Sequence, residues 1–325
     1  MSETLLRIKL GLSNIFMPME IIIGGIANAL MAVIWQFGAN SRGMPFSTYF
    51  STLALVDLLI LVFPGTLRVR FIFTDNVLTS VPNLCRFQIY AVYAWLQISN
   101  WISTILTLER TLTILFPVKF QTHMIKNRSK YVLIILIVYL SLINIPHLVY
   151  AKYNDQMVCH WDDQYYDNLF VYEIITDTVL GITLPIVLII TCNVVSLIVL
   201  CTRRNQTRNG SSTNVVTTFK QLTLWTGLTL VIANSVWLFC VLIILGVFSV
   251  PEDDYANLVH IANIALYLNC AVNPIIYLFV CKCIREDFVA GFRRCVAALL
   301  NRNIRSSDRS DVSEAQNETT VTELS

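Results

Sequence analysis

Residues 131–151 read YVLIILIVYLSLINIPHLVYA and contain no Asp, Glu, Lys or Arg. A helix needs about 20 apolar residues to cross the hydrocarbon core of a bilayer, and this run is long enough. The run is apolar nearly all round, whereas a helix at the surface of a soluble domain carries a polar stripe. The stretch therefore predicts a membrane-spanning helix.

Six further apolar blocks flank this one, and polar or turn-forming residues separate them. They lie near 15–37, 47–67, 85–115, 171–201, 218–247 and 257–281. Charged residues make up only 14% of the chain, against about 25% in soluble domains, so there are too few to coat soluble surfaces. We therefore expect an all-α membrane protein, namely a bundle of seven transmembrane helices over residues 15–281.

The Lys and Arg residues predict how the bundle is oriented. With seven spans, the loops after the first, third and fifth lie on the same side as the C-terminus. That side is rich in Lys and Arg, whereas the other side has six and many acids. By the positive-inside rule the C-terminus is cytoplasmic and the N-terminus extracellular. We expect a multi-pass protein of the plasma membrane with a short extracellular segment at residues 1–14.

The residues after the last block form two segments. Residues 282–300 are amphipathic, with Ile284, Phe288 and Phe292 on one face, which predicts a short eighth helix on the cytoplasmic membrane surface. Residues 301–325 are rich in Ser, Thr and acids and predict a disordered tail. Three cysteines near this helix are candidates for palmitoylation, and free buried thiols explain them equally well: Cys281, Cys283 and Cys295.

Several polar residues fall inside the predicted spans. A charge at mid-bilayer costs roughly 3 kcal/mol, so an acid there suggests a function. Asp57 lies mid-span in its block, and amide or hydroxyl side chains lie at comparable depth in other blocks: Asn28, Ser99, Asn100, Asn269 and Asn273. These oxygens suit a hydrated monovalent cation or a proton site. An interhelical hydrogen-bond network explains them equally well.

The third block links two further features. Of the nine cysteines, only Cys85 and Cys159 lie on the predicted outer face, where a disulfide could form. Arg110 follows Cys85 by 25 residues, about 37 Å of helix, which places Glu109 and Arg110 at the inner surface. An adjacent Glu–Arg pair there could hold the helix ends closed. A simple interfacial arginine is the alternative.

Asn273-Pro274-Ile275-Ile276-Tyr277 lies at the inner end of the last block. Proline cannot donate a backbone hydrogen bond and kinks a helix. We expect Asn273 to donate to the carbonyl that Pro274 frees.

Taken together, these motifs resemble the rhodopsin-like receptor family over residues 15 to 300, in order and spacing more than in any single motif. The matching segments are Gly25 to Asn28, Leu53 to Asp57, Leu108 to Thr111, Pro185, Trp237 and Asn273 to Tyr277. The resemblance implies a G-protein-coupled receptor. It places an allosteric sodium ion at Asp57, Ser99, Asn269 and Asn273, and a disulfide between Cys85 and Cys159.

The resemblance also implies how the signal passes. Arg110, beside Glu109, would contact the C-terminal helix of a heterotrimeric G protein, and Tyr277 would swing toward it. Pro185, Trp237 and Pro274 would belong to the switch. Arrestin and receptor kinases would be further partners. The chain departs from the family pattern at several positions, which raises the expectation of an atypical signalling threshold or of high basal activity. These positions are Asn100, Asn193, Ala233 and Phe239.

Two positions lack the residues that bind known classes of ligand, which reduces the number of ligand classes to consider. Val92 stands where amine receptors carry an aspartate, and Tyr267 stands where visual pigments carry the retinal lysine. The expected cavity is lined by Tyr93, Leu96, Gln97, Tyr172, Trp237 and Tyr267, below an acidic mouth that includes Asp162 and Asp163. Acids would steer a cation inward, so we predict a short amidated cationic neuropeptide, of the kind that invertebrate-type receptors bind. A small non-amine molecule or a lipid is the alternative, and the acids could serve solubility alone.

Other functional classes fit the sequence less well. A transporter would show repeats or broken helices in matched positions, and a channel would show a filter loop or a polar pore helix. An enzyme would need a convergent nucleophile, base or metal set. The sequence has none of these. We therefore expect no enzyme, no cofactor apart from the sodium ion, and no nucleic-acid partner; membrane lipid surrounds the chain.

Overall fold

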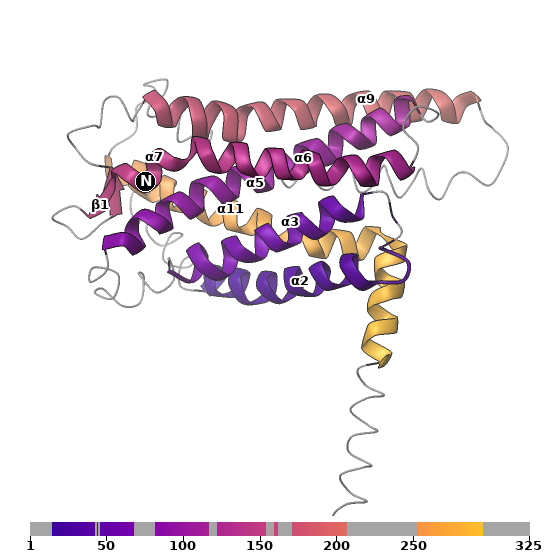
Figure 1. The fold of residues 1–325 in the computed structure, drawn as a ribbon, viewed down its shortest axis with the longest axis horizontal. Coiled ribbons are helices and arrows are strands. Elements are labelled where there is room, and N and C mark those ends of the chain that lie inside the picture. Colours follow the sequence, from indigo (N-terminus) through magenta and orange to yellow (C-terminus); the bar gives the residue numbers. More distant parts are fainter. Residues whose placement is uncertain are drawn as a thin grey trace, which may run out of the picture.

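A computed structural model describes residues 15–42, 44, 46–67, 82–116, 122–153, 159–161, 171–206 and 252–294. Almost all of them are helical, in long helices that run side by side (Figure 1). The helices are α2 (Met17–Phe37), α3 (Ser47–Ile60), α5 (Pro82–Leu115), α6 (Thr122–Ile143), α7 (Ile145–Tyr150), α9 (Leu184–Gln206) and α11 (Glu252–Val280). Two π-helical stretches, η2 (Leu61–Gly65) and η4 (Ile174–Thr183), continue α3 and precede α9.

These helices occupy six of the seven predicted spans, and the predicted span 218–247 lies outside the described residues. Among the described residues, four stretches are long and apolar enough to cross a membrane: Met17–Phe37, Ser47–Gly65, Arg128–Tyr150 and Val171–Val199. The pair Ile264–Phe279 and Lys282–Arg294 passes the same test together, with a 90° bend between its helices. The chain is a multi-pass membrane protein.

Helix α5 is less apolar than these four stretches, and its position inside the bundle explains why. It contacts α3, α6, α7 and α9, so its sides face protein more than lipid. Its polar side chains are buried among these neighbours, including Gln97, Ser99, Asn100, Thr104 and Glu109. A helix that lies inside a bundle can carry polar groups that would be too costly against lipid.

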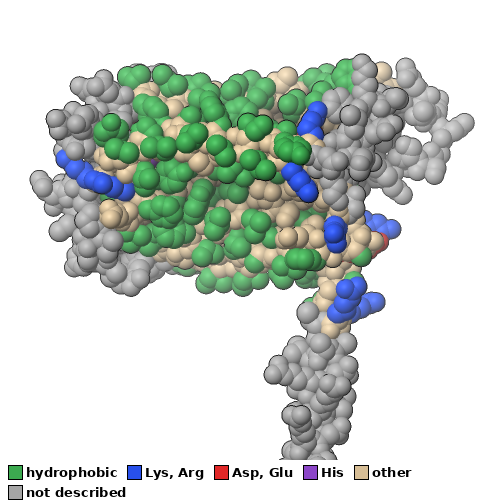
Figure 2. Space-filling model, viewed as in Figure 1, with side chains coloured by type: hydrophobic (Ala, Val, Ile, Leu, Met, Phe, Trp, Pro, Cys, Tyr) green, Lys and Arg blue, Asp and Glu red, His purple; other side chains and the backbone are tan. Residues whose placement is uncertain are grey.

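The outer surface of the bundle is apolar. Large hydrophobic side chains on several helices remain exposed, such as Ile22 (62%), Ile135 (69%) and Phe279 (73%). Figure 2 shows these side chains spread along the bundle, with Lys and Arg toward its ends. Soluble proteins rarely expose apolar patches of this extent. The surface is the one expected of helices that face lipid.

A two-stranded hairpin covers one end of the bundle. Strand β1 (Ala151–Tyr153) pairs antiparallel with β2 (Cys159–Trp161), with Tyr153 opposite Cys159. Arg86 donates from Nε to the Ala151 carbonyl oxygen at 3.1 Å, which ties the hairpin to the start of α5. The hairpin and the Lys282–Arg294 helix lie at opposite ends of the bundle (Figure 1).

Two prolines in the spans are matched by asparagines from neighbouring helices. Pro185 has no N–H to donate to the Gly181 carbonyl four residues earlier, and Asn100 Nδ2 on α5 donates to that oxygen at 3.0 Å. The departure at Asn100 is thereby explained. Gly181 also allows this contact, because a Cβ there would lie 2.9 Å from Gln97 Cγ.

At the second proline, Pro274, the donor is a different asparagine from the one that the sequence predicts. The carbonyl that Pro274 leaves without a backbone donor belongs to Cys270, and it accepts from Asn28 Nδ2 of α2 at 3.0 Å. Asn273, which we had expected to fill this role, donates to Asp57 instead. The Asn273 amide is occupied by the Asp57 carboxylate. Asn28, which is 1% exposed and lies against α11, supplies the donor from α2 instead.

The Lys282–Arg294 helix, which we name the tail helix, follows α11 after Cys281. It leaves the bundle at a right angle, as predicted for a helix on the membrane surface (Figure 1). Asp287 fastens it to the turn after α2, because its carboxylate accepts from the backbone N–H groups of Asn40 and Ser41, at 3.1 and 2.8 Å. The Ser41 hydroxyl donates to the same carboxylate.

Candidate functional site

The polar side chains buried in the bundle form three groups along its length. One lies near the hairpin end, one at mid-span, and one near the tail helix. Gln97 in the first group and Arg110 in the last are 13 positions apart on α5, about 20 Å of helix. We describe the groups in that order.

The group near the hairpin end centres on Asp177 of η4, which is 4% exposed. His147 of α7 places Nε2 3.3 Å from Asp177 Oδ2, and Gln97 of α5 donates from Nε2 to Asp177 Oδ1. Asn144 donates from Nδ2 to Gln97 Oε1 at 2.9 Å. Three helical segments thus surround one buried carboxylate.

Aromatic rings border this carboxylate. The His147 ring stacks on the Tyr93 ring, with centroids 4.2 Å apart and an angle of 8° between the planes. The Tyr93 hydroxyl donates to Glu173 Oε1 at 2.8 Å, and the Tyr172 ring lies 6.1 Å from His147. Carboxylates beside aromatic rings form a set of side chains that suits a cationic group.

Some of the residues predicted to bind ligand meet here, and others do not. Tyr93, Gln97 and Tyr172 belong to the group just described, whereas Leu96 and Tyr267 pack with the hydrophobic core. Trp237, Asp162 and Asp163 lie outside the described residues.

Sequence reasoning missed Asp177 and His147. Asp177 is an acid inside the apolar block 171–201, which is the same signal that singled out Asp57. His147 carries no comparable signal, because its partner Asp177 lies on another helical segment.

The mid-span group centres on Asp57 of α3, which is fully buried. Ser99 Oγ donates to Asp57 Oδ1 at 2.6 Å, and Asn273 Nδ2 donates to Asp57 Oδ2 at 2.9 Å. The side-chain amide oxygens of Asn28 and Asn269 are buried, and none of the described residues donates a hydrogen bond to them. A carboxylate together with buried amide oxygens is a donor set that suits a monovalent cation.

The third group lies where α5 ends, near the tail helix. The Arg110 guanidinium carbon lies 5.0 Å from the centre of the Phe50 ring, and Arg110 is only 3% exposed. The same Phe50 ring meets the Tyr277 ring edge-on at 4.8 Å and stacks on Trp35 at 4.4 Å. Phe50 therefore contacts both residues that we predicted to form the inner switch. Sequence reasoning missed Phe50, because an aromatic residue in an apolar block carries no special signal.

Glu109 differs from the expectation of an adjacent Glu–Arg pair. Its Oε1 is 2.8 Å from Arg128 Nη2 at the start of the fourth span. Successive side chains on a helix point about 100° apart, so Glu109 and Arg110 face different neighbours. Arg110 Nε and Nη2 are buried and have no hydrogen-bond partner within the part of the chain that the structure describes. The Glu109 carboxylate therefore joins two helices, and it does not hold Arg110.

Thr111 occupies the third position of the same motif and is 4% exposed. Its hydroxyl lies 2.9 Å from Ser196 Oγ of α9 and 3.3 Å from the Cys192 carbonyl oxygen. This side chain therefore joins α5 to α9, whose first turn contains Pro185.

The cysteines fall into two classes. Cys85 is disulfide-bonded, and its predicted pairing with Cys159, whose side chain lies outside the described residues, stays a prediction. Cys281 and Cys283 are free thiols. Cys281 is 5% exposed, which leaves little access for acylation, whereas Cys283 is half-buried. Cys295 lies outside the described residues.

The sequence was compared with protein families and with curated proteins. A family model for the 7 transmembrane receptor (rhodopsin family) matches residues 28–277. No curated protein matches the chain. The matched region includes all three buried polar groups, and the family is one of receptors rather than enzymes. The chain belongs to the rhodopsin family of seven-transmembrane receptors.

Proposed function

We propose that this receptor binds a short cationic amidated peptide at its hairpin end and activates a heterotrimeric G protein at the end that carries Arg110. The hairpin end is extracellular in this proposal, and the tail helix lies at the cytoplasmic face of the plasma membrane. The support for this orientation is the excess of Lys and Arg on the side of the C-terminus.

The observation that supports a cationic ligand is the buried carboxylate of Asp177. A buried acid is costly unless it is hydrogen-bonded or paired with a cation. Gln97 and His147 contact it in the structure, and Glu173 lies nearby on the Tyr93 hydroxyl. A guanidinium or ammonium group at this end would lie near two acids, Asp177 and Glu173, with the aromatic rings of Tyr93 and Tyr172 close by.

A peptide screen tests the ligand class. Cells that express the receptor are exposed to short amidated peptides, with calcium and cyclic AMP as readouts. We expect a basic peptide to activate, and Asp177→Asn to lower its potency at least tenfold. Glu286→Gln removes an acid from the exposed tail helix and serves as the matched control. Equal potency at the Asp177→Asn receptor would argue against the peptide cation as the recognised group.

The proposal includes a sodium ion held by the mid-span group. Asp57 and Ser99 supply oxygens at one place, and Asn273 holds the carboxylate in position. The buried side-chain oxygen of Asn269 accepts no hydrogen bond from any residue that the structure describes, as would suit a cation ligand. Agonist binding is compared in sodium chloride and choline chloride. We expect sodium to lower agonist affinity in the natural receptor and to have no effect in Asp57→Asn; the same sodium effect in both would reject this site.

A further inference from the structure

An apolar groove lies between α2, α11 and the tail helix. Its volume is about 300 Å³. Ile26, Leu30 and Ile34 form one wall on α2, Pro274 and Leu278 form another on α11, and Phe288 of the tail helix closes one end. A volume of this size lies at the lower limit of small-molecule sites.

The shape of the groove follows from the helices around it. Residues 26, 30 and 34 recur every four positions, so they form one stripe along α2. The 90° bend after α11 turns the tail helix across the end of this stripe. The tail helix is held there by Asp287, through Asn40 and Ser41. The groove is thus fixed by contacts outside it.

The groove opens toward lipid. Ile26 in its wall is 60% exposed and Leu30 is 46% exposed, and both lie on a helix that crosses the membrane. Phe292, one turn after Phe288 on the tail helix, is 64% exposed. Because the lining is apolar, an occupant in this position has to present an apolar surface, as a lipid acyl chain does.

Basic side chains lie at the closed end. The tail helix carries four basic residues and two acids, and both acids have partners: Glu286 pairs with Lys282, and Asp287 binds Asn40 and Ser41. Arg285 precedes Phe288 by three positions, so both lie on one face of the helix. Its Nη1 donates to the Phe279 carbonyl, next to Leu278 in the groove wall. A guanidinium therefore lies beside the end of the groove.

We propose that this groove binds one anionic glycerophospholipid from the surrounding membrane. One acyl chain occupies the groove, and the phosphate-bearing headgroup contacts Arg285 at the membrane surface. The proposal depends on the apolar groove and Arg285 together. A purely apolar groove would accept any lipid, and a basic helix alone would attract anionic lipids without fixing one. This site is independent of the proposed peptide ligand and of G-protein activation.

Lipid retention tests the site on the whole purified receptor. The receptor is incubated in detergent with equal amounts of phosphatidylserine and phosphatidylcholine that carry identical acyl chains, and bound lipid is counted by native mass spectrometry. We expect preferential retention of phosphatidylserine. One basic residue near a membrane surface changes the binding of an anionic lipid about 5-fold, so Arg285→Gln should lower the preference by that factor.

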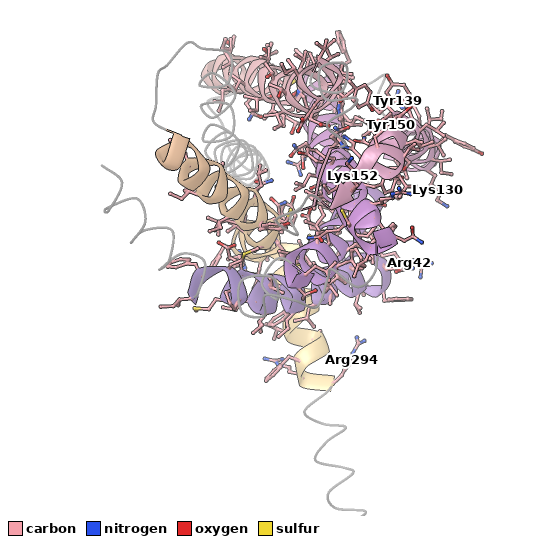
Figure 3. The ribbon with its side chains drawn as sticks, turned by 90° about the vertical axis from the view of Figure 1, so that its left-hand side faces the viewer. Arg42, Lys130, Tyr139, Tyr150, Lys152 and Arg294 are labelled. Atoms are coloured by element: carbon pink, nitrogen blue, oxygen red, sulfur yellow. The ribbon has the colours of Figure 1, made fainter. Side chains whose placement is uncertain are left out.

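Two further variants fill the groove. Ala27 lines it, and Ala27→Phe should lower retention of both lipids; Leu30→Phe is a second version in case the first folds poorly. Ile135→Phe, on the lipid-facing side of α6, and Lys130→Gln are the controls and should leave retention unchanged. Lys130 lies on α6, away from Arg294 and the tail helix (Figure 3).

Four results would overturn the proposal. The preference for phosphatidylserine could be equal in the natural receptor and in Arg285→Gln, which would rule out the headgroup contact. A neutral sterol could be retained instead, in a manner that Ala27→Phe abolishes. An acyl chain could be found covalently attached at Cys283 with no bound phospholipid, or a second receptor copy could exclude lipid. Each of the last three results would assign the groove to another occupant.

Discussion

The guanidinium carbon of Arg110 lies 5.0 Å from the centre of the Phe50 ring, and the same ring contacts Tyr277. The cation is therefore held by an aromatic face rather than by the neighbouring Glu109, which pairs with Arg128. A cation over a ring contributes about 2 kcal/mol when it is desolvated. Under the proposed function, this contact would restrain Arg110 before a G protein binds.

Replacing Phe50 with Leu should release that restraint. Loss of about 2 kcal/mol corresponds to roughly 30-fold in an equilibrium constant, so basal nucleotide exchange per folded receptor should rise several-fold. Phe50→Tyr keeps the ring and is the matched control. Exchange is measured on purified receptor in lipid discs without ligand. If the Leu variant behaves like the natural receptor and the Tyr variant, Phe50 does not restrain Arg110.

The Glu109–Arg128 pair should stabilise the junction of α5 and α6. Arg128 is 49% exposed and Glu109 is 4% exposed, so solvent weakens the pair to about 1 kcal/mol. Arg128→Glu should lower the unfolding temperature, because two carboxylates then face each other. The double exchange Glu109→Arg with Arg128→Glu should recover part of the loss. A double variant no more stable than the two single changes predict would show that the pair contributes nothing.

Asn100 should be needed only because Pro185 is present. Asn100→Leu leaves the buried Gly181 carbonyl without its side-chain donor, which costs about 1 to 3 kcal/mol. Pro185→Ala restores a backbone N–H four residues after Gly181. The combined variant should therefore lose less stability than Asn100→Leu alone, as measured by thermal unfolding in lipid discs. Additive losses would contradict the pairing.

The attachment of the tail helix should weaken in acid. Burial raises the pKa of Asp287, but hydrogen bonds from Ser41 and Asn40 outweigh it and set the pKa below its ordinary value of 3.8. A carboxyl with a lowered pKa stabilises the fold above pH 3.8, and that stabilisation is lost as the pH falls through the folded-state pKa. Hydrogen exchange at Asn40 and Ser41, corrected for intrinsic rates, should speed up below pH 3.8. Asp287→Asn should show fast exchange at neutral pH as well, and protection equal to that of the natural receptor at neutral pH would refute the attachment.

Much of the fold could be predicted from the sequence, because the thickness of a bilayer fixes the length of each apolar run. The helices α2, α9 and α11 overlap the predicted blocks for this reason. The acid Asp57 could also be found, since a charge in such a run stands out. The helix end at Phe37 is close to its prediction because Gly38 and polar residues follow.

The partners of these residues could not be predicted. Asn28 reaches the Cys270 carbonyl across 242 positions of sequence, and Glu109 reaches Arg128 rather than its neighbour. Both contacts depend on how far each helix is rotated about its axis, and many rotations fit the same apolar pattern. Asp177 stands out in the sequence as an acid within the apolar block 171–201. The sequence does not show that Gln97 and His147 contact it.

In the proposed function, Arg110 passes the signal to a G protein. The most direct measurement is guanine-nucleotide exchange on a purified G protein with receptor in lipid discs, for the natural chain and for Arg110→Ala. We expect exchange above that of empty discs with the natural receptor, and exchange equal to that of empty discs with Arg110→Ala. Exchange that is the same in the natural receptor, in Arg110→Ala and in empty discs, both basally and with every peptide tried, would contradict the account.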